Sequence, residues 1–91
     1  MERIWVRVIL DNKIAAQKTA ALPGGLLGGV RSVEVVKEAL GEVCKDMDEP
    51  RPIWLKSHER QMASFGQAVF RPEHFVEGVS FDRLEVEVID T

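Results

Sequence analysis

The sequence predicts a single α+β domain over residues 1–91, and three segments carry this prediction. Residues 3–10 and residues 80–90 place apolar side chains at every second position, which is typical of β-strands. Between them, residues 33–47 place apolar side chains at helical spacing. A helix with one apolar stripe must cover the apolar face of a sheet, so helix and strands are expected in one core.

The first two strands are predicted to form a hairpin. The apolar face of the first strand consists of Ile4, Val6, Val8 and Leu10. Asp11 and Asn12 follow, and because both residue types tolerate positive φ they favour a tight turn. Residues 13–21 are then expected to return as the second strand. Residues 23–29 contain four glycines and are predicted to be a loop.

The central helix is predicted over residues 33–47, with Pro50 and Pro52 ending it. Its apolar stripe consists of Val33, Val36, Leu40, Val43, Cys44 and Met47. Gly41 lowers helix propensity, so it is expected to mark a close packing point. The shorter elements predicted after the helix are a strand over residues 53–56, helical turns over 58–65, an extended piece over 67–70 and a turn over 72–76.

This order of elements resembles the β-grasp, or ubiquitin-like, fold, a mixed sheet in ββαββ order packed on one long helix. The resemblance rests on the opening strand, the Asp11–Asn12 turn, the long helix, the strand after Pro52 and the closing strand. The alternative is a ferredoxin-like βαββαβ sandwich, which needs a second full helix over residues 58–65. The strings Pro-Ile-Trp-Leu-Lys-Ser-His-Glu and Phe-Asp-Arg-Leu-Glu-Val-Glu-Val resemble small bacterial proteins of unknown function, and this likeness implies no activity.

Composition argues against several classes of protein. Twelve basic and fifteen acidic side chains give a net charge of −3, so a dedicated nucleic-acid binder is not expected, despite a local basic run with one Trp over residues 51–60. Apolar runs are too short to span a membrane and no secretion signal is present, so a cytoplasmic protein is expected. A single cysteine excludes a disulfide framework and a cysteine-ligated cluster, and Cys44 is expected to be inert in the core.

His58 and His74 are the only histidines, and both lie near acidic residues in the sequence. They support an alternative function as a small enzyme or as a ligand- or metal-binding protein, but two histidines alone make a weak metal site. Their distance in the structure is the observation that discriminates the alternatives. The glycine pairs before the helix lack the Lys and Ser or Thr of a phosphate loop, and no cofactor is expected.

The predicted function is a non-catalytic protein-interaction module of ubiquitin-like fold. The resemblance implies that the first and last strands lie side by side in the sheet centre, with the face opposite the helix open to a partner or a second copy. Arg7 is expected to pair there with Glu85 or Glu87. Trp54 and Lys56 join this face if Ile53 and Leu55 point inward; burial of the tryptophans is the competing interpretation. The candidate surface consists of Trp5, Arg7, Ile9, Trp54, Lys56 and Ile89, with Leu26 and Leu27 from the glycine-rich loop.

Overall fold

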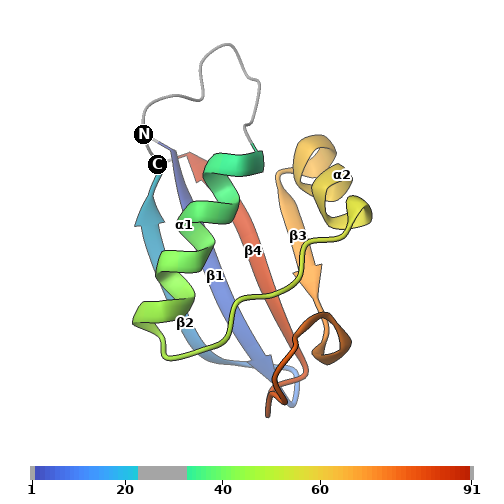
Figure 1. The fold of residues 1–91 in the computed structure, drawn as a ribbon. Coiled ribbons are helices and arrows are strands. Elements are labelled where there is room, and N and C mark those ends of the chain that lie inside the picture. The colour runs from blue at the N-terminus through green and yellow to red at the C-terminus, as the bar shows by residue number, and fades with distance from the viewer. Residues whose placement is uncertain (1, 23–32, 91) are drawn as a thin grey trace.

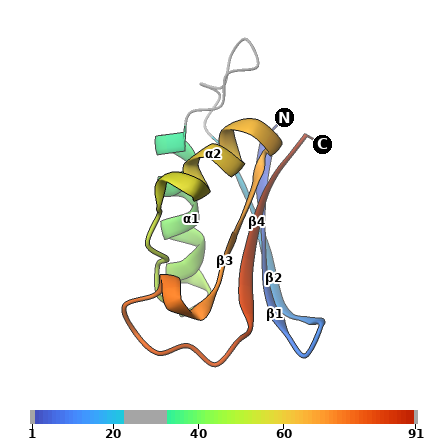
Figure 2. The ribbon, with the colours of Figure 1, turned by 90° about the vertical axis from the view of Figure 1, so that its right-hand side faces the viewer.

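The computed structural model describes residues 2–22 and 33–90, which form a sheet layer with two helices on one face (Figures 1 and 2). The elements in chain order are β1 (Glu2–Leu10), β2 (Lys13–Ala21), α1 (Val33–Asp46), α2 (Lys56–Phe65), β3 (Gln67–Phe70), the 3-10 turn η2 (Pro72–His74) and β4 (Arg83–Asp90). The predicted α+β class is therefore confirmed. The predicted glycine-rich loop, including Leu26 and Leu27, lies outside the described residues.

The described strands form one sheet in the order β2-β1-β4-β3, and every neighbouring pair is antiparallel. The first and last strands lie side by side in the centre, as expected, but the prediction of a mixed sheet is wrong. After α1, residues 47–55 carry the chain back along the sheet, so β3 begins at the end where α1 begins and β4 runs against β1 (Figure 1). The order ββααββ also differs from the ferredoxin-like alternative.

The hairpin turn between β1 and β2 forms as predicted. Asp11 and Asn12 have φ angles of 53° and 63°, the left-handed conformations that a two-residue hairpin turn requires. The backbone N–H of Asp11 donates a hydrogen bond of 2.9 Å to the carboxylate of Asp82, just before β4. The turn is thereby fixed to the start of the last strand.

The core lies between the helices and the central strands, as the apolar faces predict. Its buried members from these elements are Ile4, Val6 and Val8 of β1, Leu84, Val86 and Val88 of β4, and Val36, Leu40, Val43 and Cys44 of α1. Val33 and Met47 at the ends of the stripe are partly buried against it. Leu10 lies beyond the last core pair, Val8 with Leu84, and is exposed.

Residues 53–56 form no strand, so this prediction is wrong. The N–H of Ile53 donates to the carbonyl of His74 at 2.6 Å, and Lys56 already begins α2. The outward N–H of Val69 in β3 is bound to the side chain of Gln61 of α2 at 3.4 Å, so this edge of the sheet offers no ladder to residues 53–56. The predicted turns over 58–65 are a ten-residue helix, which ends at the predicted Gly66 with φ 71°.

Gly41 is a close packing point, as predicted, because a Cβ at this buried position would overlap the guanidinium of Arg51. The far end of a flexible arginine can move away. Gly41→Ala is therefore expected to raise the free energy of unfolding by up to about 1 kcal/mol, because alanine has the higher helix propensity. Loss of the contact with Arg51 is expected to reduce this gain.

A double-mutant cycle measured by urea unfolding checks this expectation. In the Arg51→Ala background, Gly41→Ala is expected to give the full gain of about 1 kcal/mol. A loss of stability from Gly41→Ala in both backgrounds would show that something other than Arg51 fills the space.

Candidate functional site

The two histidines lie together in a cluster of rings that we call the aromatic cluster, Trp54, His58, Phe70 and His74. His58 of α2 is 2% exposed, and its ring lies 4.5 Å from the ring of His74 in an edge-to-face arrangement. The same imidazole stacks on Phe70 at 4.3 Å, and Trp54 packs edge-on against Phe70 at 4.9 Å. The sequence left the distance between the histidines open, and the structure brings them into contact.

Backbone groups occupy the Nδ1 atoms of both histidines. Nδ1 of His58 accepts the N–H of Leu55 at 3.0 Å, and Nδ1 of His74 accepts the N–H of Arg71 at 3.0 Å. Burial and then the neighbouring His74 lower the pKa of His58, while a hydrogen bond with the Val69 backbone partly offsets this. Near neutral pH His58 is therefore an uncharged side chain held on both sides by backbone groups.

This geometry suits helix capping better than metal binding or acid–base chemistry. Each histidine lies three residues after the backbone N–H that it satisfies, at the start of α2 and of η2. No group of three or more His, Cys, Asp or Glu side chains within residues 2–22 and 33–90 is placed to hold a metal ion. The repeated spacing in Leu-Lys-Ser-His and Arg-Pro-Glu-His is the sequence signal that could have predicted both caps.

The face of the sheet away from the helices carries a connected set of charges. Arg7 forms ion pairs with Glu85 at 3.0 Å and Glu87 at 3.1 Å, so the predicted pairing is confirmed with both acids. Hydrogen bonds from Arg83 and then Arg7 lower the pKa of Glu85. The Arg7 guanidinium also lies 4.1 Å over the ring of Trp5. These charged groups find their partners within the sheet itself.

Two isoleucines of the predicted surface are buried or partly buried. Ile9 is only 5% exposed, in register between Ile14 and Arg83, so it cannot be an exposed anchor. Ile89 is partly buried opposite Arg3.

Trp54 and Lys56 do not join this face, so that part of the prediction is wrong. Trp54 belongs to the helix layer, since it packs on Phe70 while Ile53 and Leu55 are 43% and 46% exposed. Lys56 starts α2 and lines a hollow with Val33 and Glu59.

β2 is an edge strand of nine residues that pairs only with β1. The N–H of Leu22 donates to the carbonyl of Glu2 at 3.0 Å, which fixes the phase of the ladder. Because hydrogen-bonded and non-bonded pairs alternate in an antiparallel ladder, the N–H groups of Gln17, Thr19 and Ala21 point outward. Within the described parts of the chain, no hydrogen-bond acceptor meets them. Sequence reasoning missed this edge, since strand order cannot be read from periodicity alone.

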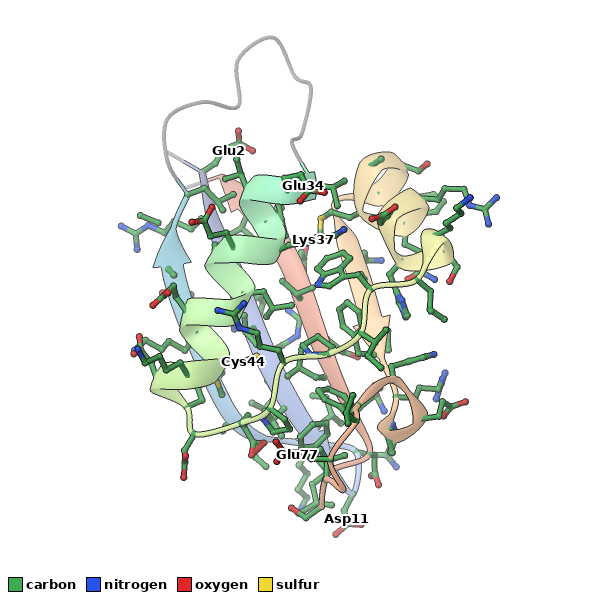
Figure 3. The ribbon with its side chains drawn as sticks, viewed as in Figure 1. Glu2, Asp11, Glu34, Lys37, Cys44 and Glu77 are labelled. Carbon is green, nitrogen blue, oxygen red and sulfur yellow. The ribbon has the colours of Figure 1, made fainter. Side chains whose placement is uncertain are left out.

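The other edge strand, β3, is short and is covered by α2. Gln61 accepts the outward N–H of Val69, and His58 forms a hydrogen bond with the backbone of the same residue. α2 is held in place by Lys37, which lies at the α2 side of α1 near Glu34 (Figure 3) and forms ion pairs with Glu34 and Glu59. The two edges of the sheet therefore differ: one is sealed by side chains and the other is open.

Cys44 lies in the core, as predicted. Burial, and then the charge of Glu49, raise the pKa of its thiol to about 11. A thiol that stays protonated and buried is a poor nucleophile.

Comparison of the chain with protein-family models, with curated proteins and with solved structures finds no match. Among the described residues, neither helix has the length and apolar character needed to cross a bilayer.

Replacing each tryptophan by serine is expected to lower the free energy of unfolding by different amounts, because the two side chains lie on opposite sides of the sheet. Trp54→Ser removes a member of the aromatic cluster and is expected to lower the free energy of unfolding by about 3 kcal/mol. Trp5→Ser removes a ring covered by Arg7 on the open face and is expected to cost only about 1 kcal/mol. Urea unfolding of the two variants measures the difference, and equal costs would contradict the placement of Trp54 in the helix layer.

The stability of the protein is expected to fall as the pH drops below the ordinary histidine pKa of 6.5. The pKa of His58 is lowered in the folded state, so below pH 6.5 the unfolded chain binds more protons than the folded one. Stability is then lost as the pH falls toward and through the folded-state pKa, because protonated Nδ1 can no longer accept the N–H of Leu55. Urea unfolding at about pH 7.5 and about pH 5.5 measures this loss.

His58→Asn is the matched variant, because its amide oxygen preserves an acceptor near Nδ1 but does not titrate. It is expected to lower stability at both pH values and to flatten the slope between them. An unchanged slope in His58→Asn would assign the pH dependence to other groups.

Proposed function

We propose that this chain is a non-catalytic protein-interaction domain that binds an extended segment of a partner protein as an added strand along β2. The observation that carries the proposal is the outward row of N–H groups from Gln17, Thr19 and Ala21. An unpaired strand edge offers a partner a complete ladder of backbone hydrogen bonds.

The contrast with β3 supports this proposal. Proteins usually protect exposed strand edges, because such edges recruit other chains. Here Gln61 and His58 cover the four-residue edge of β3, while the longer edge of β2 carries small residues such as Ala16 and Ala20. Small side chains allow a second backbone to approach closely.

The competing functions have less support. A metal ligand or a general base would need a ring nitrogen with a free lone pair. In His58 and His74 the Nδ1 lone pair accepts a backbone N–H, and a neutral imidazole in that tautomer carries its proton on Nε2. The open sheet face remains a candidate surface, but its charged groups Arg7, Arg83, Glu85 and Glu87 are paired with one another. The β-grasp resemblance adds no support, because β1 and β4 are antiparallel. The likeness to small bacterial proteins and the cytoplasmic location remain predictions.

Selection of random linear peptides against the full chain tests the proposal. Bound peptides are expected to slow amide hydrogen exchange at Gln17, Thr19 and Ala21, the outward N–H groups of β2. Thr19→Pro removes one outward donor without removing a bond to β1, and is expected to abolish binding. Thr19→Val, which keeps the N–H, is the matched control and is expected to bind normally.

Peptides that bind while the exchange of these three amides is unchanged would refute the proposed function. Failure to select any linear peptide would refute it as well. The exchange measurement on the unaltered chain stands even if Thr19→Pro does not fold.

A further inference from the structure

A hollow runs beside the open edge, between β2 and α1. Its volume is about 280 Å³, and its lining residues are Ala20, Ala21, Val35, Glu38, Ala39 and Glu42. A strand added to β2 would turn every second side chain toward α1 and thus toward this hollow. The alanines leave room there for a side chain of moderate size, and the floor of the hollow is apolar.

The rim of the hollow is acidic. Glu38 and Glu42 lie one helical turn apart on α1, and neither forms an ion pair within residues 2–22 and 33–90. Lys18 of β2 is engaged by Asp46 at 3.0 Å, and Lys45, three residues after Glu42 on α1, forms no ion pair with that carboxylate. Two carboxylates that have no ion-pair partner among the described residues, beside an apolar floor, favour a partner with positive charge next to an apolar side chain.

We infer that the strand received by β2 comes from a different protein and carries Lys or Arg two positions from a small apolar residue, so that both side chains face α1. This inference rests on the proposed strand addition at β2. The apolar side chain fills the hollow, and the basic side chain reaches Glu38 or Glu42. A residue spacing of two keeps both on the same side of the added strand.

A second copy of this chain fits the same edge poorly. Antiparallel pairing of β2 with its own copy about a two-fold axis would continue the sheet and place both α1 helices on the same face. Glu38 and Glu42 of one copy would then face the same acids of the other copy across the hollow. Like charges opposed in this way disfavour the dimer, whereas a basic strand meets no such repulsion.

The experiment titrates the isotopically labelled full chain with two seven-residue peptides and follows backbone amide signals. In the first peptide Thr alternates with Lys, Val and Lys, and in the second Glu replaces both Lys residues. The Lys peptide is expected to shift signals of β2 and α1 and to bind at least about tenfold more tightly than the Glu peptide. Higher salt is expected to reduce the difference, because the attraction is between exposed charges.

A double substitution of the rim tests the role of the acids. Glu38→Lys with Glu42→Lys is expected to reverse the preference between the two peptides. The matched control is Glu73→Lys with Glu77→Lys, which changes the net charge equally at exposed positions that do not line the hollow. Glu77 lies toward the end of the molecule that holds Asp11 (Figure 3). This control is expected to keep the preference for the Lys peptide.

The other outcomes would refute either the basic partner, the strand addition at β2 or the choice of a different protein. Equal binding of both peptides at β2, or equal loss in both double variants, refutes the basic partner but leaves strand addition intact. Absence of shifts at β2 with every peptide refutes the proposed function itself. Sedimentation that shows the unaltered chain forming a dimer through β2, abolished by Thr19→Pro, refutes the inference of a different protein.

Discussion

The buried imidazole of His58 is the contact on which the arrangement of the second half of the chain depends. It accepts the backbone N–H of Leu55, the residue before α2, forms a hydrogen bond with the backbone of Val69, stacks on Phe70 and contacts the ring of His74. One uncharged side chain therefore joins the start of a helix, the edge of a strand, the core and the turn before β4. Because this contact seals β3, the exposed backbone of the sheet is concentrated at β2.

The two faces of the sheet differ in what covers them and in the side chains that they carry. The helix side buries the aliphatic residues of β1, β4 and α1, and the ion pair of Lys37 with Glu59 holds α2 beside α1. On the other side the described residues place no layer above the sheet, and there Arg7 pairs with Glu85 and Glu87 while covering Trp5. Partly exposed ion pairs of this kind add little stability, but they leave the face with few unpaired charges for a ligand. We therefore place the proposed partner strand at the edge of the sheet, along β2, and not on its face.

Periodicity predicted the elements that bury one face, namely β1, β4 and α1. It failed where a short apolar run has two possible uses. Residues 53–56 carry strand-forming side chains, yet Trp54 packs inward on Phe70. The nearby edge of β3 is covered by Gln61 of α2, so it is not free to pair with the neighbours of Trp54. Ile9, which is buried, pairs in register with Ile14 and Arg83, which come from two other strands. The antiparallel sense of β4 depends on the path of residues 47–55, and the open edge at β2 depends on strand order. Neither leaves a local signal in the sequence.

The central strands of the sheet come from distant parts of the chain, since β1 ends at Leu10 and β4 begins at Arg83. During synthesis, the hairpin of β1 with β2 and the helix α1 leave the ribosome well before β4. Until β4 emerges, Ile4, Val6 and Val8 lack the strand that completes their core, and the far edge of β1 stays unpaired. Contacts of such long sequence separation slow folding and extend the time during which a nascent chain is prone to aggregate. A longer stage with an incomplete sheet during translation is thus a consequence of placing β1 and β4, which lie far apart in the described chain, at the middle of the sheet.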